Sequence, residues 1–192
     1  MSLKKAYLIV IAVLLIDQIS KIYVKTHFML EESVSVFSWF KIQFIENEGM
    51  AWGAKIPHWL GGKLTLTLFR IVAVGGIGWW LWDSVKKNQS IYLITSIALI
   101  LAGAFGNIID SVFYGLIFDH SFPGKVAVFT TERHYGKLFE GKVVDMLYFP
   151  IYRNSEGHTY FFNAIFNIAD AAISVGVGIL IVFNKKAFPK HS

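Results

Sequence analysis

Two aspartates lie in apolar stretches where a charged side chain is rare. Asp170 lies in the run Phe161–Ser174, which is otherwise typical of a membrane helix, and Asp145 follows Val143 and Val144. A carboxylate at membrane depth costs at least a few kcal/mol, so it is seldom found there without a function. Two carboxylates that meet can share one proton, because nearby like charges raise the pKa of one of them. This is the chemistry of an aspartic protease.

The composition indicates a small polytopic membrane protein. Of the 192 residues, 55% are hydrophobic and only 16% are charged, whereas soluble domains carry roughly 25% charged residues. We expect a single membrane domain over residues 1–192. The net charge of +5 does not indicate nucleic acid, because the lysines cluster at the ends of apolar runs instead of forming a basic patch. The chain has no cysteine, which excludes disulfides, thiol nucleophiles and Cys-ligated metals.

Four segments are long enough to span a bilayer, which needs about 20 mostly apolar residues. They are about 5–25, 64–82, 91–114 and 160–183. The first resembles a signal peptide, but no small-residue cleavage site follows it, so we interpret it as an uncleaved helix. Residues 33–56 are expected to form a small β-cradle, because polar and apolar residues alternate in much of this stretch. A long loop, 118–158, precedes the fourth helix. The predicted fold class is therefore mainly α.

The basic residues predict the orientation of these helices. Lysines lie at the ends expected to be cytoplasmic, and they are Lys4, Lys5, Lys86, Lys87, Lys185, Lys186 and Lys190. Both termini should then be cytoplasmic and both long loops outside. A helix rises about 1.5 Å per residue, which puts Asp170 roughly 15 Å below the outer end of the fourth helix. By the same argument the other buried carboxylates fall in the outer leaflet.

Several polar groups near these aspartates have two interpretations each. Four polar residues spaced by four, three and four lie on one face of the predicted fourth helix, and they are Asn163, Asn167, Asp170 and Ser174. The face either lines an internal site or joins helices, as Asn and Ser commonly do in membranes; for Asp170 we favour function. Asp145 is expected in an interfacial loop, where it is either held against the membrane by its apolar flanks or simply solvated.

Other candidates lie at the ends of the predicted helices. Asn107 and Asp110 share a face and either end the third helix or orient a site. Asp17, Gln18 and Lys21 offer a similar choice: they either orient a site, or Asp17 and Lys21 simply pair along the first helix. The segment Asn47–Gly53 forms either a turn or part of a site. The side chain of Arg70 needs a carboxylate or carbonyl partner unless it reaches the outer surface.

Metal and cofactor chemistry finds no support in the sequence. The histidines are scattered in loops without the spacing of a metal site, and they are His27, His58, His120, His134, His158 and His191. There is no GxSxG motif and no glycine-rich phosphate loop. We therefore expect neither a metal nor a cofactor.

Five short motifs occur in an order that resembles one known family. They are Asp17-Gln-Ile-Ser-Lys21, Asn47-Glu-Gly-Met-Ala-Trp52, Gly106-Asn-Ile-Ile-Asp110, Gly141-Lys-Val-Val-Asp145 and Phe166-Asn-Ile-Ala-Asp170. Over nearly its whole length the chain resembles lipoprotein signal peptidase, also called signal peptidase II, a bacterial inner-membrane aspartic peptidase. Each motif alone is weak, but five in order at four-helix spacing form a specific pattern.

The resemblance implies a reaction and a role for each site residue. The enzyme would cleave prolipoproteins just before a diacylglyceryl-modified cysteine, act as a monomer among membrane lipids and be inhibited by globomycin-like peptides. Asp145 and Asp170 would be catalytic. The implied substrate-orienting residues are Asn47, Gly49, Asn107, Asn167 and Arg70, and the implied structural supports are Asp17, Lys21 and Asp110.

The chain departs from the family pattern in two ways. Ser111 stands where the family usually has an arginine, whose charge would have to come from Arg70, Lys142 or Arg153. An insertion, about residues 116–140, separates two motifs and creates a second candidate, Asp119. We prefer Asp145 because Val-Val-Asp is retained there. We interpret the insertion as a small hairpin that covers the catalytic aspartates and touches the substrate.

Two other classes of function would also use buried carboxylates. A proton- or solute-coupled transporter would spread them across the membrane and usually shows an internal repeat, whereas here they share one depth and no repeat is visible. A membrane assembly factor would instead bind a partner through its outer loops.

Overall fold

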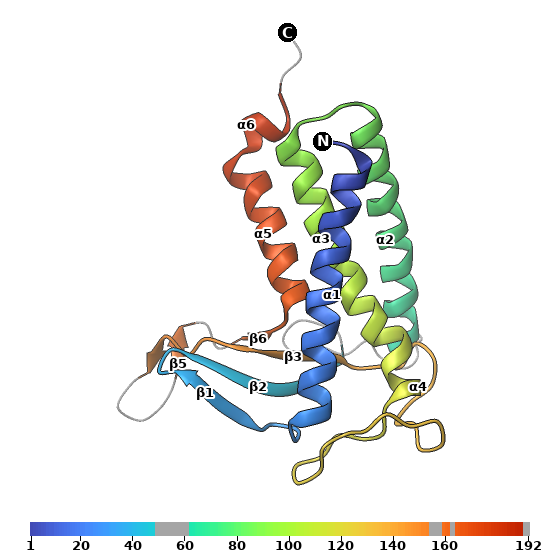
Figure 1. The fold of residues 1–192 in the computed structure, drawn as a ribbon, viewed down its shortest axis with the longest axis vertical. Helices are drawn as coiled ribbons and strands as arrows, with labels where there is room; N and C mark the ends of the chain where they lie inside the picture. The colour runs from blue at the N-terminus through green and yellow to red at the C-terminus, as the bar shows by residue number, and fades with distance from the viewer. Residues whose placement is uncertain (49–61, 154–158, 162–163, 190–192) are drawn as a thin grey trace. The chain divides into compact units, whose positions relative to one another are not determined.

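The computed structural model describes residues 1–48, 62–153, 159–161 and 164–189. The helices are α1 (Leu3–His27), α2 (Gly62–Lys86), α3 (Ile91–Ile109), the π-helix η3 (Asp110–Tyr114), α4 (Gly115–Ile117), α5 (Ile168–Val182) and α6 (Asn184–Ala187) (Figure 1). The strands are β1 (Ser33–Phe37), β2 (Phe40–Asn47), β3 (Val143–Tyr148), β4 (Tyr152–Arg153), β5 (Thr159–Phe161) and β6 (Ile165–Phe166). Contacts within the chain divide it into two compact units.

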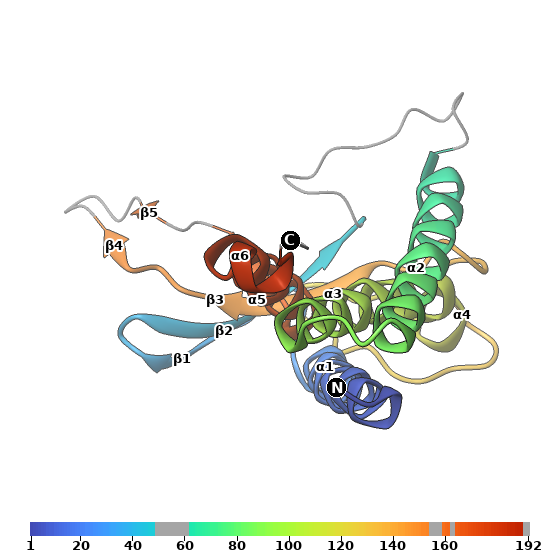
Figure 2. The same cartoon turned by 90° about the horizontal axis from the view of Figure 1, so that it is seen from above.

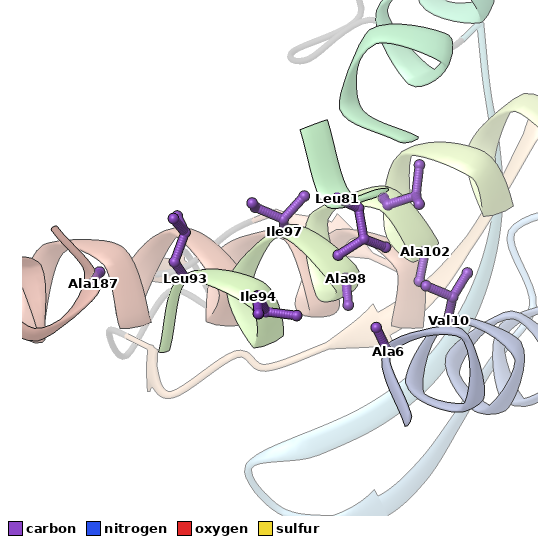
Figure 3. Packing of buried hydrophobic residues seen from close by; sticks show 10 residues of the cluster. Ala6, Val10, Leu81, Leu93, Ile94, Ile97, Ala98, Ala102 and Ala187 are labelled. Atoms are coloured by element: carbon purple, nitrogen blue, oxygen red, sulfur yellow. The ribbon is translucent and has the colours of Figure 1, made fainter. Parts of the chain in front are cut away.

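The first unit is a helical bundle made of Met1–Gln18, Leu64–Ile108 and Ile168–Ser192. In it α3 lies between α2 and α5 (Figures 1 and 2). The buried apolar core is drawn largely from α3, and it contains Ala6, Val10, Leu81, Leu93, Ile94, Ile97, Ala98, Leu101, Ala102 and Ala187 (Figure 3). The central position of α3 explains why it is the most completely apolar and buried of the long helices.

The outer faces of this bundle are apolar as well. Leu8, Phe69 and Val72 are 67%, 70% and 75% exposed. Apolar exposure on this scale marks a surface that contacts lipid or another protein. Three segments are long and apolar enough to cross a bilayer: Leu3–His27, Gly62–Lys86 and Ile91–Ile117. Helix α5 is also apolar but has only 15 residues.

The fourth helix begins later than the sequence predicts. We expected it over 160–183, but α5 begins at Ile168. The preceding residues form strands: β5 pairs with β4, and β6 pairs with β3. Apolar runs of this length fit a buried strand as well as a helix, and here the backbone hydrogen bonds of these residues are made to neighbouring strands.

The second unit, Ile19–Lys63 and Ile109–Asn167, is built on an antiparallel sheet. The strand order is β1-β2-β3-β6, with β4 and β5 forming a separate pair. Alternate residues of a strand face opposite sides of the sheet. One face packs into a buried cluster of Val24, Phe44, Tyr114, Phe118, Val144 and Met146. Residues 33–47 provide two strands of the expected cradle, and the rest of that prediction, 49–56, lies outside the described residues.

The insertion contains a hairpin whose tip is a Pro-Gly turn. Phe118 bridges to Phe129, and Phe122 bridges to Lys125 across Pro123 and Gly124. Gly124 has a φ of +92°, a conformation that glycine adopts without strain and that the third position of a type II turn requires.

The chain then returns along η3 and satisfies carbonyls that the irregular helix leaves available. Backbone N–H groups of Gly136, Phe139 and Gly141 donate to the carbonyls of Gly115, Val112 and Ser111, at 3.0, 3.1 and 2.9 Å. Gly141 must lack a side chain, because a Cβ there would lie 2.0 Å from the carbonyl oxygen of Asp110. This close approach sets where β3 begins.

Small residues allow α3 and α5 to pack closely. A Cβ at Gly103 would lie 2.2 Å from the carbonyl oxygen of Ala169, and a Cβ at Gly176 would lie 2.8 Å from that of Ser96. Glycine is common at such helix crossings in membrane proteins because backbones can then approach each other. The contact fixes the start of α5, which carries Asp170.

Replacing Gly103 by Ala should therefore lower the free energy of unfolding by about 1–3 kcal/mol, the usual cost of overpacking. The matched control is Gly178→Ala on α5, where a Cβ would meet nothing within 4 Å. That change should be neutral or slightly stabilising, because alanine favours helix by up to about 1 kcal/mol. Thermal unfolding in detergent measures both, and equal effects of the two changes would contradict the close packing.

Candidate active site

Asp145 lies on a strand and not in the loop that the sequence suggested. It occupies β3 between β2 and β6, and its side chain points away from the face that buries Val144 and Met146, because strand residues alternate. Asp145 is 4% exposed. The apolar flanks that indicated a membrane-held loop belong instead to this buried central strand.

Two carboxamides hold the carboxylate of Asp145. Asn47 Nδ2 donates to one oxygen at 3.1 Å, and Asn167 Nδ2 donates to the other at 2.7 Å. Asn47 lies diagonally across from Asp145, since Asn47 pairs with Val143 in the antiparallel register. Asn167 also donates to the carbonyl of Val144 at 3.2 Å, so its amide fixes both the strand and the carboxylate.

The predicted polar face of the fourth helix is only partly formed. Asn167 is fully buried and lies just before α5, whereas Asp170 and Ser174 are within it. Asn163 lies outside the described residues. Asn167 therefore contacts the sheet, whereas Asp170 lies at the start of the helix. The helical spacing of these residues does not indicate this difference.

Asp170 lies in the first turn of α5. A carboxylate is favoured there because the N-terminus of a helix carries partial positive charge. Asn107 Nδ2 on α3 donates to Asp170 Oδ1 at 2.8 Å. Arg70 on α2 is near enough to Asp170 to interact with it electrostatically.

Asp17 ties α1 to the start of α5. It is fully buried, and its Oδ1 accepts the backbone N–H of Ala169 at 2.9 Å. Its other oxygen accepts from Gln18 Nε2 at 3.1 Å, and the same amide donates to the carbonyl of Gly106. Asp17 thus satisfies one of the N–H groups left free at a helix start and helps to position Asp170.

A buried ion pair holds the start of β3. Lys21 Nζ lies 2.9 Å from Asp110 Oδ2, and both side chains are fully buried. The same oxygen accepts the backbone N–H of Val144 at 3.2 Å. Asp110 therefore links α1 to the residue that precedes Asp145.

These contacts do not build a metal site. In the described part of the chain, no three His, Asp or Glu side chains gather as a metal ion would need. Carboxamides donate N–H groups to both Asp145 and Asp170.

Comparisons with known proteins agree on one family. The model of a family described as signal peptidase (SPase) II matches residues 9–185. A lipoprotein signal peptidase of Porphyromonas gingivalis is 41% identical over 184 residues, covering 91% of this chain and 80% of that protein. One from Amoebophilus asiaticus is 34% identical, covering 95% of this chain and 78% of that protein.

The chain belongs to the signal peptidase II family. A solved structure of a bacterial membrane enzyme has the same fold, with a TM-score of 0.67 and 26% identity over 99% of this chain and 94% of that one. The protein is therefore a peptidase with a mainly helical membrane fold and a small antiparallel sheet. The comparisons give no support to the transporter alternative.

Asp119, the second candidate aspartate at the family's usual spacing, makes its described contacts within the insertion hairpin. Its Oδ1 accepts the N–H of Val128 at 2.8 Å and its Oδ2 pairs with Lys125. Burial raises the pKa of this carboxyl, but the hydrogen bonds from Lys125 and Val128 outweigh it, and the pKa is lowered. Asp119 therefore stabilises a turn of the chain near the surface.

The arginine that the family usually carries after its Gly-Asn-x-x-Asp motif is replaced here by a buried residue. Ser111 is 1% exposed, and its carbonyl accepts from Gly141. Two of the candidate cations for the role of this arginine differ in their contacts: Lys142 pairs with Glu46, whereas Arg70 interacts with Asp170. The side chain of Arg153 and the predicted substrate-binding residue Gly49 lie outside what the structure describes.

Replacing Lys21 by Met should lower the free energy of unfolding of this part of the molecule. It leaves the buried Asp110 carboxylate without its cation, which costs about 3–5 kcal/mol. The matched control is Lys87→Met, since Lys87 pairs with Asp83 but is 62% exposed; exposed pairs contribute about 0–1 kcal/mol. Chemical unfolding in detergent compares the two, and a loss no larger for Lys21→Met than for Lys87→Met would show that the buried pair contributes little.

Proposed function

We propose that this chain is an aspartic peptidase that cleaves the signal peptide of diacylglyceryl-modified prolipoproteins just before the lipidated cysteine. The family and the names of its relatives support the substrate class. The observation that carries the assignment of the two aspartates is that each accepts a hydrogen bond from the carboxamide of a distant asparagine, Asn167 on Asp145 and Asn107 on Asp170.

Chain connectivity supports joint action of the two carboxylates. Asn167, which binds Asp145, is only three residues before Asp170. In the proposed active enzyme the two carboxylates meet and share one proton, because two adjacent negative charges repel each other. The shared proton belongs to the pair, so neither residue alone is the permanent acid.

The proposed reaction uses both protonation states. The ionised carboxylate removes a proton from a water molecule, whose oxygen attacks the carbonyl carbon of the scissile peptide bond. The protonated carboxyl stabilises the oxyanion that forms and then gives its proton to the leaving amine as the C–N bond breaks. The products are the signal peptide and a lipoprotein that begins with its modified cysteine.

The neighbouring polar residues have supporting roles in this proposal. Asn47, Asn107 and Asn167 hold the carboxylates and orient the substrate backbone, with Gly49 nearby in sequence. Arg70 supplies the positive charge that the family arginine would give. Asp17, Lys21 and Asp110 position the elements that carry the two aspartates.

The proposed setting is the bacterial inner membrane. The three apolar spans and the membrane enzymes of the same fold support it. In the proposed topology the termini are cytoplasmic and the sheet and the insertion lie outside. The enzyme acts as a monomer among membrane lipids, and globomycin-like peptides inhibit it.

Either Asp145→Asn or Asp170→Asn should reduce cleavage by about 10³-fold or more, because each removes an acid–base group. Cleavage of a lipid-modified prolipoprotein by purified protein is the measurement, with thermal unfolding to establish that the variants fold. Asp119→Asn is the matched control and should keep most activity. Turnover like that of wild type in Asp145→Asn would contradict the assignment and direct attention to Asp119.

The topology predicts which positions an impermeant reagent reaches. The chain has no cysteine of its own, so a single introduced one reports its side. Thr131→Cys, at an exposed position of the insertion, should react with an impermeant thiol reagent applied outside the inner membrane. Lys87→Cys, between α2 and α3, should react only after permeabilisation. The reverse pattern would show that the orientation is inverted.

A further inference from the structure

A buried charged cluster lies on β2 directly beside a residue of the proposed site. Its centre is Glu46, whose side chain is 4% exposed. Lys25 Nζ lies 2.5 Å from Glu46 Oε1, and Ser121 Oγ donates to the same oxygen at 2.8 Å. Lys25 also donates to Ser121 Oγ at 3.1 Å, which closes a triangle. Lys142 Nζ lies 3.3 Å from the other oxygen of Glu46.

The insertion supplies much of this cluster. Besides Ser121, the insertion contributes the rings of Phe118 and Tyr135. Their centroids lie 5.1 and 4.9 Å from Lys25 Nζ, within the range of cation–π attraction. Tyr135 Oη accepts the backbone N–H of Lys142 at 2.7 Å, and burial raises the pKa of Tyr135. A neutral phenol therefore closes the cluster next to the two lysines.

The cluster and the proposed catalytic carboxylate lie on opposite faces of one sheet. Glu46 and Asn47 are consecutive strand residues, so their side chains face opposite sides. Asn47 donates to Asp145, whereas Glu46 faces the insertion. The described contacts of the insertion with β2 are thus on the face away from Asp145. These contacts therefore do not form the cover over Asp145 that the sequence predicts.

The position of Glu46 in the sheet connects the cluster to the site. Glu46 pairs with Val144 in the β2–β3 register, Asn47 pairs with Val143, and Ile45 pairs with Asp145 itself. Holding Glu46 therefore fixes β2 at the point where Asn47 reaches across to Asp145. A strand shifted by a fraction of an ångström would lengthen the 3.1 Å hydrogen bond from Asn47.

We propose that Glu46 is a positioning residue: Ser121 of the insertion and Lys25 of α1 clamp Glu46, and the insertion thereby supports the active site from behind. The role rests on the proposed function, because the group that it positions, Asn47 on Asp145, belongs to the proposed peptidase site. Lys25 and Ser121 act only through Glu46, and Glu46 acts through Asn47.

The ionised state of Glu46 strengthens the clamp. Burial raises the pKa of Glu46, but attraction and hydrogen bonding from Lys25, with smaller contributions from Ser121 and Lys142, outweigh this and lower it. Glu46 is therefore charged at neutral pH. Glu46→Gln keeps the size of the side chain and removes the charge, and Ser121→Ala removes only one hydroxyl.

The first test measures kcat and KM on a lipid-modified prolipoprotein. Glu46→Gln should lower kcat about tenfold with KM changed less than about twofold, because small displacements of catalytic groups cost rate more than binding. Ser121→Ala should lower kcat by a smaller factor, and Ser121→Thr, which keeps the hydroxyl, should restore it. The matched control is Lys125→Met, which breaks an ion pair of the same insertion outside the cluster and should leave both constants unchanged.

A double-mutant cycle separates positioning from a general loss of stability. If Glu46 acts through Asn47, then Glu46→Gln should have almost no further effect on kcat in an Asn47→Ala background. Equal factors in the two backgrounds would overturn the proposal, as would unchanged kcat in both Glu46→Gln and Ser121→Ala.

Hydrogen exchange gives a readout that does not depend on activity. Amides of β2 and β3 should exchange faster in Ser121→Ala and Glu46→Gln than in wild type or Lys125→Met, because the clamp holds these strands. If both variants exchange at the wild-type rate, the clamp is overturned, even if the wild-type protein cleaves prolipoprotein. Faster exchange in the two variants, combined with a wild-type protein that cleaves no prolipoprotein, would support the clamp and refute the proposed function.

Discussion

Burying a carboxylate is costly unless other groups donate hydrogen bonds to it or neutralise it, and this constraint organises both units of the chain. Apart from Asp119, which is held within its own hairpin, the buried acidic groups of the described residues find donors on segments far away in sequence. The partners are Asp17 with Ala169, Asp110 with Lys21 and Val144, Asp145 with Asn47 and Asn167, and Glu46 with Lys25 and Ser121. The acidic residues thereby fix where helices begin and where strands pair.

The donors differ in a way that matches the proposed roles. Asp110 and Glu46 pair with lysines, and a close cation keeps a carboxylate ionised. Asp145 accepts from two carboxamides, which donate N–H groups and carry no charge. Neutral donors suit an acid–base group that must change its protonation state during the reaction. The ion pairs suit residues whose part is to hold the elements in place.

The sequence predicts much of the fold because the strongest signals are long and local. Three apolar runs predict α1, α2 and α3 closely, since membrane helices need about 20 apolar residues. The fourth run was misjudged at its start because the residues before α5 are apolar for a different reason, pairing in β5 and β6. Asp145 was misplaced in a loop for a related reason: β3 is short, and its partner β2 lies about one hundred residues earlier.

The residues of the proposed site can be chosen from the sequence, but their contacts cannot. Family motifs predict Asp145, Asp170 and three asparagines as site residues, but a motif does not say which amide meets which carboxylate. Asn167 was assigned to a helical face, whereas it bonds to Asp145 and to β3. The sequence predicts that the insertion is a cover because long structured loops in compact proteins are often lids or binding loops. Its pairing with Glu46 joins residues 75 apart in sequence, and nothing local indicates it.

The cleavage site is the most direct test of the proposed function. Purified protein should be incubated with a diacylglyceryl-modified prolipoprotein, and the new N-terminus of the product should be determined by mass spectrometry. A product that begins with the lipid-modified cysteine, formed by wild type and not by Asp170→Asn, is the expected result. Cleavage at another bond, or equal cleavage by the Asp170→Asn variant, would contradict it.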